Sequence, residues 1–277
     1  LHRQPPIQCP HTRGDEPELG QEGPKEKMRL PRTIQGVIME RIDRLTEDQK
    51  MTLQVASVIG PEFSLELLKG VLGSDEREVQ GNLQELVRSE FIHQKVYWPD
   101  QVFGFRHVLI QEVAYSGLLL QRRKAYHGAV AQLLERLYAG KVGERCEELA
   151  FHYSSGENFE KALEYWTLAG NKASRIYAVR EAIGYFQAAL QALEALPSSR
   201  YRLGQRMDVD MKYSFVLSLA GKYEEALSVL RDAERIAEEV EDHGRLMQVC
   251  SRMATILFWK GGAWDETSLY QRKAFEL

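Results

Sequence analysis

His107 and Arg106 are the residues whose types and spacing best suit an anion. His107 stands at the predicted start of a helix and follows Arg106 directly, which brings together an imidazole, a guanidinium and the free N–H groups of a helix N-terminus. This combination fits a phosphate group. The alternative is a structural histidine that closes a β-hairpin.

A second basic group begins at Arg122, fifteen residues after His107. It has the positive charge to contact nucleic acid or a phosphate. The helix predicted over 75–88, which would enter a DNA groove, carries four acidic side chains against two basic ones, so phosphates would repel it. We therefore favour a solvated helix start whose long side chains cover apolar surface. The members of this basic group are Arg122, Arg123, Lys124 and His127.

The sequence contains no recognisable catalytic or metal-binding constellation. It has no G-x-x-x-x-G-K-[ST] phosphate loop and no G-x-S-x-G nucleophile motif. Cys146 and His152 are six residues apart, a poor spacing for two ligands of one metal on a helix. Neighbouring carboxylates such as Glu147 and Glu148 lie on a predicted exposed face. We predict that the chain is not an enzyme and holds no cofactor or metal.

Composition narrows the class of protein further. The chain has 277 residues, with 36 Lys and Arg against 40 Asp and Glu, and 44% of its residues are hydrophobic. No apolar run approaches the roughly 18 residues that a membrane span needs, and the first residues lack the apolar core of a signal peptide. The three cysteines are far apart, which suits a reducing compartment. We expect a cytoplasmic protein with no membrane contact.

The predicted elements divide the chain into three parts. Residues 1–29 are rich in Pro, Gly and charge and are expected to form a disordered leader. Apolar periodicity begins at Leu30, and Thr46 with Gln49 fits a helix capping box. Short helices are predicted over 64–72 and 75–88, and two strands over 91–98 and 102–105. Three helices closed by a β-hairpin outline a winged-helix-like domain over 30–140.

From residue 106 onward the pattern is almost entirely helical. Predicted helices cover 107–120, 122–139, 144–155, 158–171, 172–177, 180–196, 200–219, 222–240, 242–260 and 265–277. Overall the sequence predicts an all-α fold with one small β-hairpin.

Similar segments recur in the second half of the chain. Each places a bulky apolar residue three positions before a small one, which lets a paired helix approach closely. Their spacing is irregular and does not follow the regular TPR (tetratricopeptide) period, but three of the segments follow a turn signal and precede a long amphipathic helix. We therefore favour stacked helix hairpins of the TPR type over 141–277, and a non-repeating helical bundle is the alternative. The residues concerned are Phe159, Ala162, Val179, Ala182, Tyr223, Ala226 and Trp264.

Several blocks resemble the segment that follows the ATPase core in the STAND class of multidomain signalling ATPases. They include RIDRL at 41–45, VASVIGPEF at 55–63 and FRHVLIQEVAY at 105–115, and the likeness covers about residues 30–240. This part of the sequence is especially similar to bacterial proteins in which a nucleotide cyclase domain precedes an AAA-type ATPase and a TPR tail. The resemblance implies that His107 touches the β-phosphate of ADP bound to an upstream module, with Arg106 as an adjoining cation.

These observations lead to one functional expectation and one alternative. Leu1 in place of Met and the absent phosphate loop make us expect a piece of a larger ATPase, whose parent binds ATP or ADP. We expect a regulatory, protein-binding region: the TPR-like array binds a protein partner or effector, and an ATPase module lies upstream in the same chain. The alternative is a DNA-binding regulator that uses the winged helix, although the net charge of −4 disfavours nucleic acid.

Overall fold

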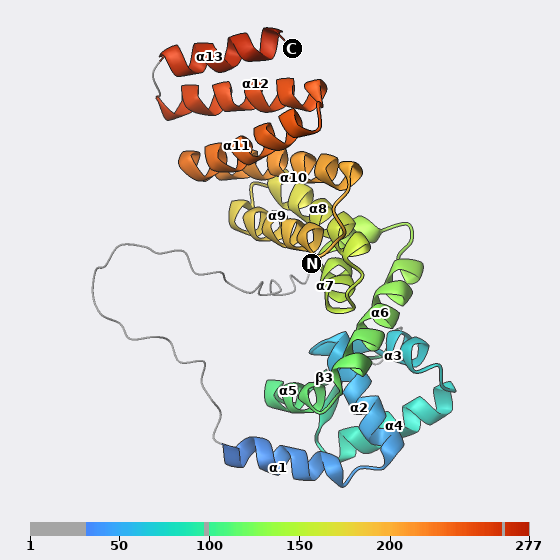
Figure 1. Cartoon of the computed structure of the whole chain (residues 1–277). Helices are drawn as coiled ribbons and strands as arrows, with labels where there is room; N and C mark the ends of the chain where they lie inside the picture. The colour runs from blue at the N-terminus through green and yellow to red at the C-terminus, as the bar shows by residue number, and fades with distance from the viewer. Residues whose placement is uncertain (1–31, 97–99, 262–263, 277) are drawn as a thin grey trace, which may run out of the picture. The chain divides into compact units, whose positions relative to one another are not determined.

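Residues 32–96, 100–261 and 264–276 are described by the computed structural model (Figure 1). They fall into two compact units. The first ends at Ala139 and also includes Ser155–Glu157, and the second contains Gly140–Ser154 and the residues from Asn158 onward. The leader predicted for residues 1–29 lies outside the described residues. Within the described part, no helix is both long and apolar enough to cross a membrane.

The described residues of the first unit form six helices and a small antiparallel sheet. Its elements are α1 (Arg32–Asp43), α2 (Glu47–Ile59), β1 (Glu62–Ser64), α3 (Leu65–Leu72), α4 (Glu76–Arg88), β2 (Ile92–Val96), β3 (Val102–Phe105), α5 (Val108–Ser116) and α6 (Leu120–Leu137). The winged-helix prediction rests on the order of helices and strands along the chain, and the order observed from α2 to β3 is compatible with it. The capping box predicted at the start of α2 is present, because Thr46 and Gln49 exchange side-chain to backbone hydrogen bonds.

The predicted β-hairpin gains a third strand. β3 lies in the middle of the sheet, between β2 and the short strand β1. Phe63 of β1 pairs with Phe103, and their ring centroids are 6.0 Å apart, while the Phe105 ring lies 5.9 Å away from Phe63. A three-residue strand is too short to show an alternating pattern, so the prediction of a two-stranded hairpin was incomplete.

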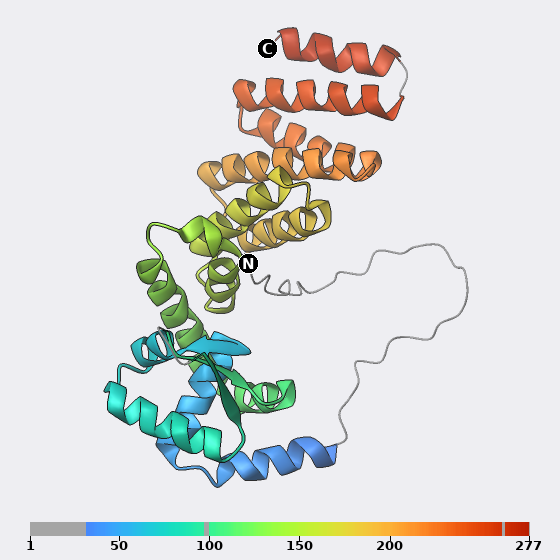
Figure 2. The ribbon, with the colours of Figure 1, turned by 180° about the vertical axis from the view of Figure 1, so that it is seen from behind.

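The second unit is a series of antiparallel helices (Figures 1 and 2). A 3-10 turn (Val142–Glu144) precedes α7 (Cys146–Ser155), α8 (Phe159–Arg175), α9 (Val179–Glu194), α10 (Arg200–Leu219), α11 (Tyr223–Glu239), α12 (His243–Lys260) and α13 (Trp264–Glu276). α8 packs on α9, α10 on α11 and α12 on α13, and α10 also contacts α8 and α12. The predicted helical class and the stacked helix hairpins are confirmed.

Similar turns follow α7, α8, α10, α11 and α12. Residues Glu157, Tyr177, Gly221, Glu241 and Gly261 all have positive φ, between 55° and 76°. At the first four turns, the N–H of the following residue bonds to a carbonyl five residues earlier, as in a Schellman motif. The left-handed residue is a glycine only twice, so the glycines in the sequence reveal only part of this regularity.

α8 is one helix, whereas the sequence predicted two helices over 158–171 and 172–177. Gly170 lies close to the predicted boundary, and α8 continues through it. A Cβ at Gly170 would lie 2.7 Å from the ring of Phe186 on α9. The missing side chain therefore permits close contact between α8 and α9.

The residues predicted to pack the repeats have two kinds of environment. Ala162, Ala182 and Ala226 are fully buried, as a close-contact position requires. Phe159, Val179 and Tyr223, each three positions earlier, are half-buried. Trp264 differs, because it is 72% exposed and fills no gap within the described residues. Whether this pattern marks true TPR repeats stays a prediction.

Candidate interaction site

Two adjoining hollows open along α8, α10 and α12. Their volumes are about 590 and 530 Å³, and they share Tyr201, Gln205 and Asp208. These three residues and Lys212 recur on α10 at steps of four, three and four, which places them on one face of that helix. We call the two hollows together the α10 groove. The first is lined also by Glu160, Leu163, Glu164, Thr167, Arg202 and Val209, and the second by Arg200, Gly204, Met207, Val240, Asp242 and Arg245.

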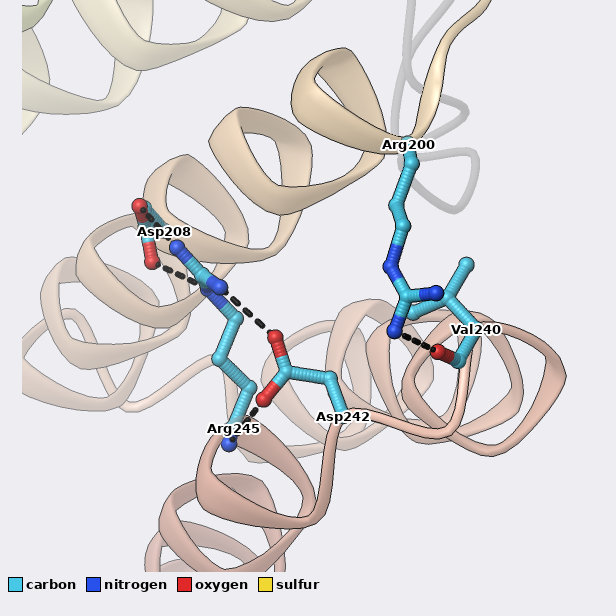
Figure 3. Close-up of polar contacts among 5 residues, drawn as sticks. All are labelled: Arg200, Asp208, Val240, Asp242 and Arg245. Carbon is cyan, nitrogen blue, oxygen red and sulfur yellow. Dashed lines mark hydrogen bonds and ion pairs between the residues drawn. The ribbon is translucent and has the colours of Figure 1, made fainter.

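Arg245 of α12 holds one wall of the α10 groove in place (Figure 3). Its Nε and Nη2 donate to the two carboxylate oxygens of Asp208 on α10, at 2.9 and 3.1 Å. Its Nη1 donates to Asp242, the N-cap residue of α12, at 2.7 Å. The guanidinium lies against the backbone of Gly204, where a Cβ would be 3.4 Å from Cζ. One side chain thus ties α12 to α10.

The carboxylate of Asp242 also caps its own helix. It accepts the backbone N–H of Arg245 at 3.0 Å, and this hydrogen bond, with the one from the guanidinium, lowers the pKa of Asp242. Beside it, Arg200 donates to the carbonyl of Val240 at 2.6 Å, which joins the start of α10 to the end of α11 (Figure 3).

The opposite wall repeats this arrangement between α10 and α8. Arg202 forms an ion pair with Glu160 and donates to Gln205 at 2.7 Å. Like Arg245, it follows its helix N-cap by three residues, because Ser199 accepts its N–H as Asp242 accepts that of Arg245. Tyr201 stands between the two walls and is 70% exposed.

His107 is the N-cap of α5. Its Nδ1 accepts the backbone N–H of Leu109 at 3.2 Å, so in the neutral ring the proton sits on Nε2. Both His107 and Arg106 are exposed, and the Arg106 backbone N–H donates to the carbonyl of Phe91. This geometry accommodates the structural interpretation and leaves Nε2–H available as a donor.

The basic group at the start of α6 does not form one surface. His127 is 1% exposed and its Nε2 lies 3.0 Å from the hydroxyl of Tyr115. Burial, aided by the nearby Arg123, lowers the pKa of His127 to about 4, so it is neutral at pH 7. Arg123 donates to the carbonyls of Leu118 and Ser116.

The remaining two members also differ from each other. Lys124 pairs with Glu157 at 2.6 Å, and Arg122 is exposed. Of the four predicted basic residues, one is therefore uncharged and buried, and two are held by other groups of the first unit.

Burial makes the cysteines of the described part poor nucleophiles. Burial raises the pKa of the Cys146 thiol to about 12, and Cys250 is buried as well. Among the described residues, no group of histidine, cysteine and acidic side chains is arranged to hold a metal ion.

Comparison with known proteins gives limited matches. No protein-family model matches the chain. An uncharacterized protein of Rhizobium meliloti (strain 1021) is 23% identical over 158 residues, which is 57% of this chain and 15% of that protein. The chain thus spans about a seventh of the length of this curated relative.

A solved structure gives the second match. It is a Signal Transduction ATPase with Numerous Domains (STAND) protein with a tetratricopeptide repeat sensor, from Pyrococcus horikoshii. The two chains are 14% identical with a TM-score of 0.36, and the match covers 87% of this chain and 46% of that one.

Sequence reasoning missed the α10 groove. The residues that line it lie on or beside three helices and are up to 85 positions apart in the sequence, from Glu160 to Arg245. None of these residues belongs to a known motif. The available signal was the basic residue three positions after a capping residue, in Ser199–Arg202 and again in Asp242–Arg245.

Proposed function

We propose that this chain is the regulatory and protein-binding region of a multidomain signalling ATPase. In this proposal the second unit binds a protein partner or effector through the α10 groove. The first unit contacts a nucleotide-binding module elsewhere in the parent protein, which holds ATP or ADP. The chain itself is not an enzyme in this proposal.

The main support is the α10 groove itself. It crosses three stacked hairpins, and its walls are held by ion pairs between successive hairpins, Arg202 with Glu160 and Arg245 with Asp208. Stacked hairpins that share a continuous lining provide an extended surface for a protein segment. The residues that line it bear no arrangement of nucleophile, base and oxyanion donor.

In the first unit, the proposal assigns His107 to a phosphate. With Nδ1 occupied by the N–H of Leu109, the exposed Nε2–H is the donor for a β-phosphate oxygen of bound ADP. Arg106 adds positive charge next to it. Such a contact stabilises the ADP-bound state of the parent protein.

The DNA-binding alternative has less support. Its basic surface would rest on the start of α6, where His127 is buried and Arg123 and Lys124 are engaged. We therefore do not propose it.

The test uses the full-length parent protein, beginning with a search of the upstream DNA for a phosphate loop in all three frames. ATP turnover and ADP release are then compared between the wild type, His107→Ala, and a deletion of residues 141–277. We expect His107→Ala to speed ADP release several-fold and the deletion to change the basal turnover. An upstream sequence without a phosphate loop, or turnover that neither change affects, would overturn the proposal.

A further inference from the structure

Arg252 of α12 carries a charge that the described residues leave uncompensated. Its guanidinium lies over the ring of Phe215 on α10, with Cζ 5.2 Å from the ring centroid, and its side chain is half-buried. In the described part of the chain, no carboxylate lies within ion-pair distance of Arg252, and none of its side-chain N–H groups has a hydrogen-bond acceptor. Burial lowers the pKa of Arg252, and no neighbouring acidic charge acts in the other direction. The donors of this guanidinium are thus oriented by a ring and free to meet a ligand.

Arg252 repeats, two helical turns later, the position of Arg245 beside the α10 groove. Arg245 contacts Asp208, thirty-seven residues earlier on α10. Arg252 contacts Phe215, again thirty-seven residues earlier, so α10 and α12 run in parallel with a constant register. At the first contact a carboxylate faces the arginine, whereas at the second an aromatic ring takes its place. The counter-charge that Arg245 finds on α10 is therefore missing for Arg252.

The surface around Arg252 is basic and apolar. Lys212 and Leu219 lie one turn on either side of Phe215 on α10, and Lys212 also lines the α10 groove. Trp259 follows Arg252 by two turns on α12, and its side chain is 46% exposed. α10 has no acidic residue over 211–219, and α12 has none over 243–260. We call this surface, which continues the α10 groove, the Arg252 patch; it consists of Lys212, Phe215, Leu219, Arg252 and Trp259.

We infer that the Arg252 patch binds an acidic side chain of the partner segment, next to a bulky apolar one. This inference rests on the function proposed above and names the chemistry that the partner presents beyond the α10 groove. The carboxylate accepts hydrogen bonds from Arg252, while the apolar side chain packs on Leu219 and Trp259. Because the guanidinium is already half-buried and stacked on a ring, little further ordering is needed to form the pair.

A single carboxylate fits this surface better than a nucleic acid does. The Arg252 patch holds one arginine and one lysine, whereas a phosphate backbone needs a row of cations. Toward the α10 groove the lining becomes acidic, with Glu164 and Asp208 beside Lys212. A chain of phosphates that continued in this direction would be repelled, and the net charge of −4 adds to the repulsion.

Parallel peptide selections on the whole chain test this inference. A random nine-residue library displayed on phage is selected against the wild type and against Arg252→Gln, after circular dichroism has shown that both are folded. We expect the wild type to enrich peptides in which Asp or Glu adjoins Phe, Trp or Leu, and Arg252→Gln not to enrich them. Enrichment of basic or uncharged peptides only, the same acidic peptides from both proteins, or no enrichment would each overturn the inference.

Fluorescence anisotropy with the most enriched peptide, labelled, assigns the binding to the patch. Replacing its acidic residue by the corresponding amide, or Arg252 by Gln, should weaken binding at least ten-fold, and raised salt should weaken it too. Arg252→Lys keeps the charge but not the planar fork, and should weaken binding less than Arg252→Gln. Arg180→Gln, on an exposed position of α9 outside the patch, should change the affinity less than two-fold. The proposed regulatory function fails separately, on the nucleotide measurements described above.

Discussion

Asp210 on α10 is a fully buried carboxylate in a unit held together by apolar contacts. Burial raises its pKa to about 6, which the adjacent Arg206 partly offsets, and the charge of Asp232 on α11 raises it further. Its oxygens accept two hydrogen bonds from Arg206 Nε, at 3.2 and 3.0 Å. At pH 7 the ionised carboxylate is therefore less stable in the folded chain than in the unfolded one.

This predicts a pH-dependent stability that one substitution removes. The pKa of Asp210 in the folded chain lies above the unfolded value of 3.8. Its stabilising contribution to the free energy of unfolding is therefore fully present below pH 4 and is lost as the pH rises through 6. Relative to Asp210→Asn, the wild type should lose about 2–3 kcal/mol between pH 4 and pH 7. Urea denaturation at several pH values measures the difference. Glu181→Gln, on an exposed position, is the control, and a pH-independent difference for Asp210→Asn contradicts the prediction.

Gly170 allows α8 and α9 to pack closely, and a single methyl group should disturb them. An added Cβ would come within 3 Å of three ring carbons of Phe186, which is buried. We expect Gly170→Ala to destabilise the second unit by about 1–3 kcal/mol in urea denaturation followed by tryptophan fluorescence.

The matched control for Gly170 lies in the same unit. An added Cβ at Gly244 on α12 meets only a carboxylate oxygen of Asp242 at 3.7 Å, an ordinary contact. Gly244→Ala should leave the stability unchanged or raise it by up to about 1 kcal/mol. Destabilisation of similar size by both substitutions would show that Phe186 is not the cause.

The turn between α8 and α9 carries backbone strain at Tyr177. Its φ is 57°, and its side chain is 77% exposed, so no burial offsets the strain. The corresponding position of the next hairpin is Gly221, with φ of 74° and open space around it. We expect Tyr177→Gly to stabilise the second unit by up to about 1 kcal/mol, and Gly221→Ala to destabilise it by about 1 kcal/mol. Thermal denaturation followed by circular dichroism measures both, and shifts of the same sign would contradict the prediction.

The sequence predicted elements well where a local signal was strong. Thr46 and Gln49 marked the start of α2, and the predicted helices over 200–219 and 242–260 lie within one residue of α10 and α12. Prediction failed where the role of a residue depends on a neighbour that is distant in the sequence. The role of Gly170 depends on Phe186, sixteen residues later, and β1 is defined only by its pairing with β3.

The candidate site depended even more on distant neighbours. The charge of Arg122, Arg123, Lys124 and His127 can be read from the sequence, but the burial of His127 cannot. Likewise, nothing in the sequence pairs Arg245 with Asp208, which is thirty-seven residues earlier. The ion pairs that hold the walls of the α10 groove are therefore known only from the folded structure.

Over the second unit as a whole, the stability of each helix hairpin should depend on the hairpins next to it. α12 packs on α11 and α13 and contacts α10, and the ion pair of Arg245 with Asp208 reaches no further than α10. In such arrays each repeat is stabilised mainly by its neighbours. Hydrogen exchange measured by mass spectrometry can follow this helix by helix. Ending the chain after Glu241 should therefore accelerate amide exchange in α10 and α11 at least ten-fold, while exchange in α8 and α9 changes less than three-fold.

The milder variant Arg245→Gln separates this coupling from a general loss of folding. It keeps α12 and α13 and removes the bidentate contact with Asp208, which is half-exposed, so its cost should be about 0.5–1 kcal/mol. Because α10 and α12 share this contact, exchange should rise in these two helices and stay unchanged in α8 and α9. If Arg245→Gln accelerated exchange equally from α8 to α13, the second unit would unfold as a single cooperative block. In that case a partner bound in the α10 groove would stabilise all of its helices together, rather than the three that line the groove.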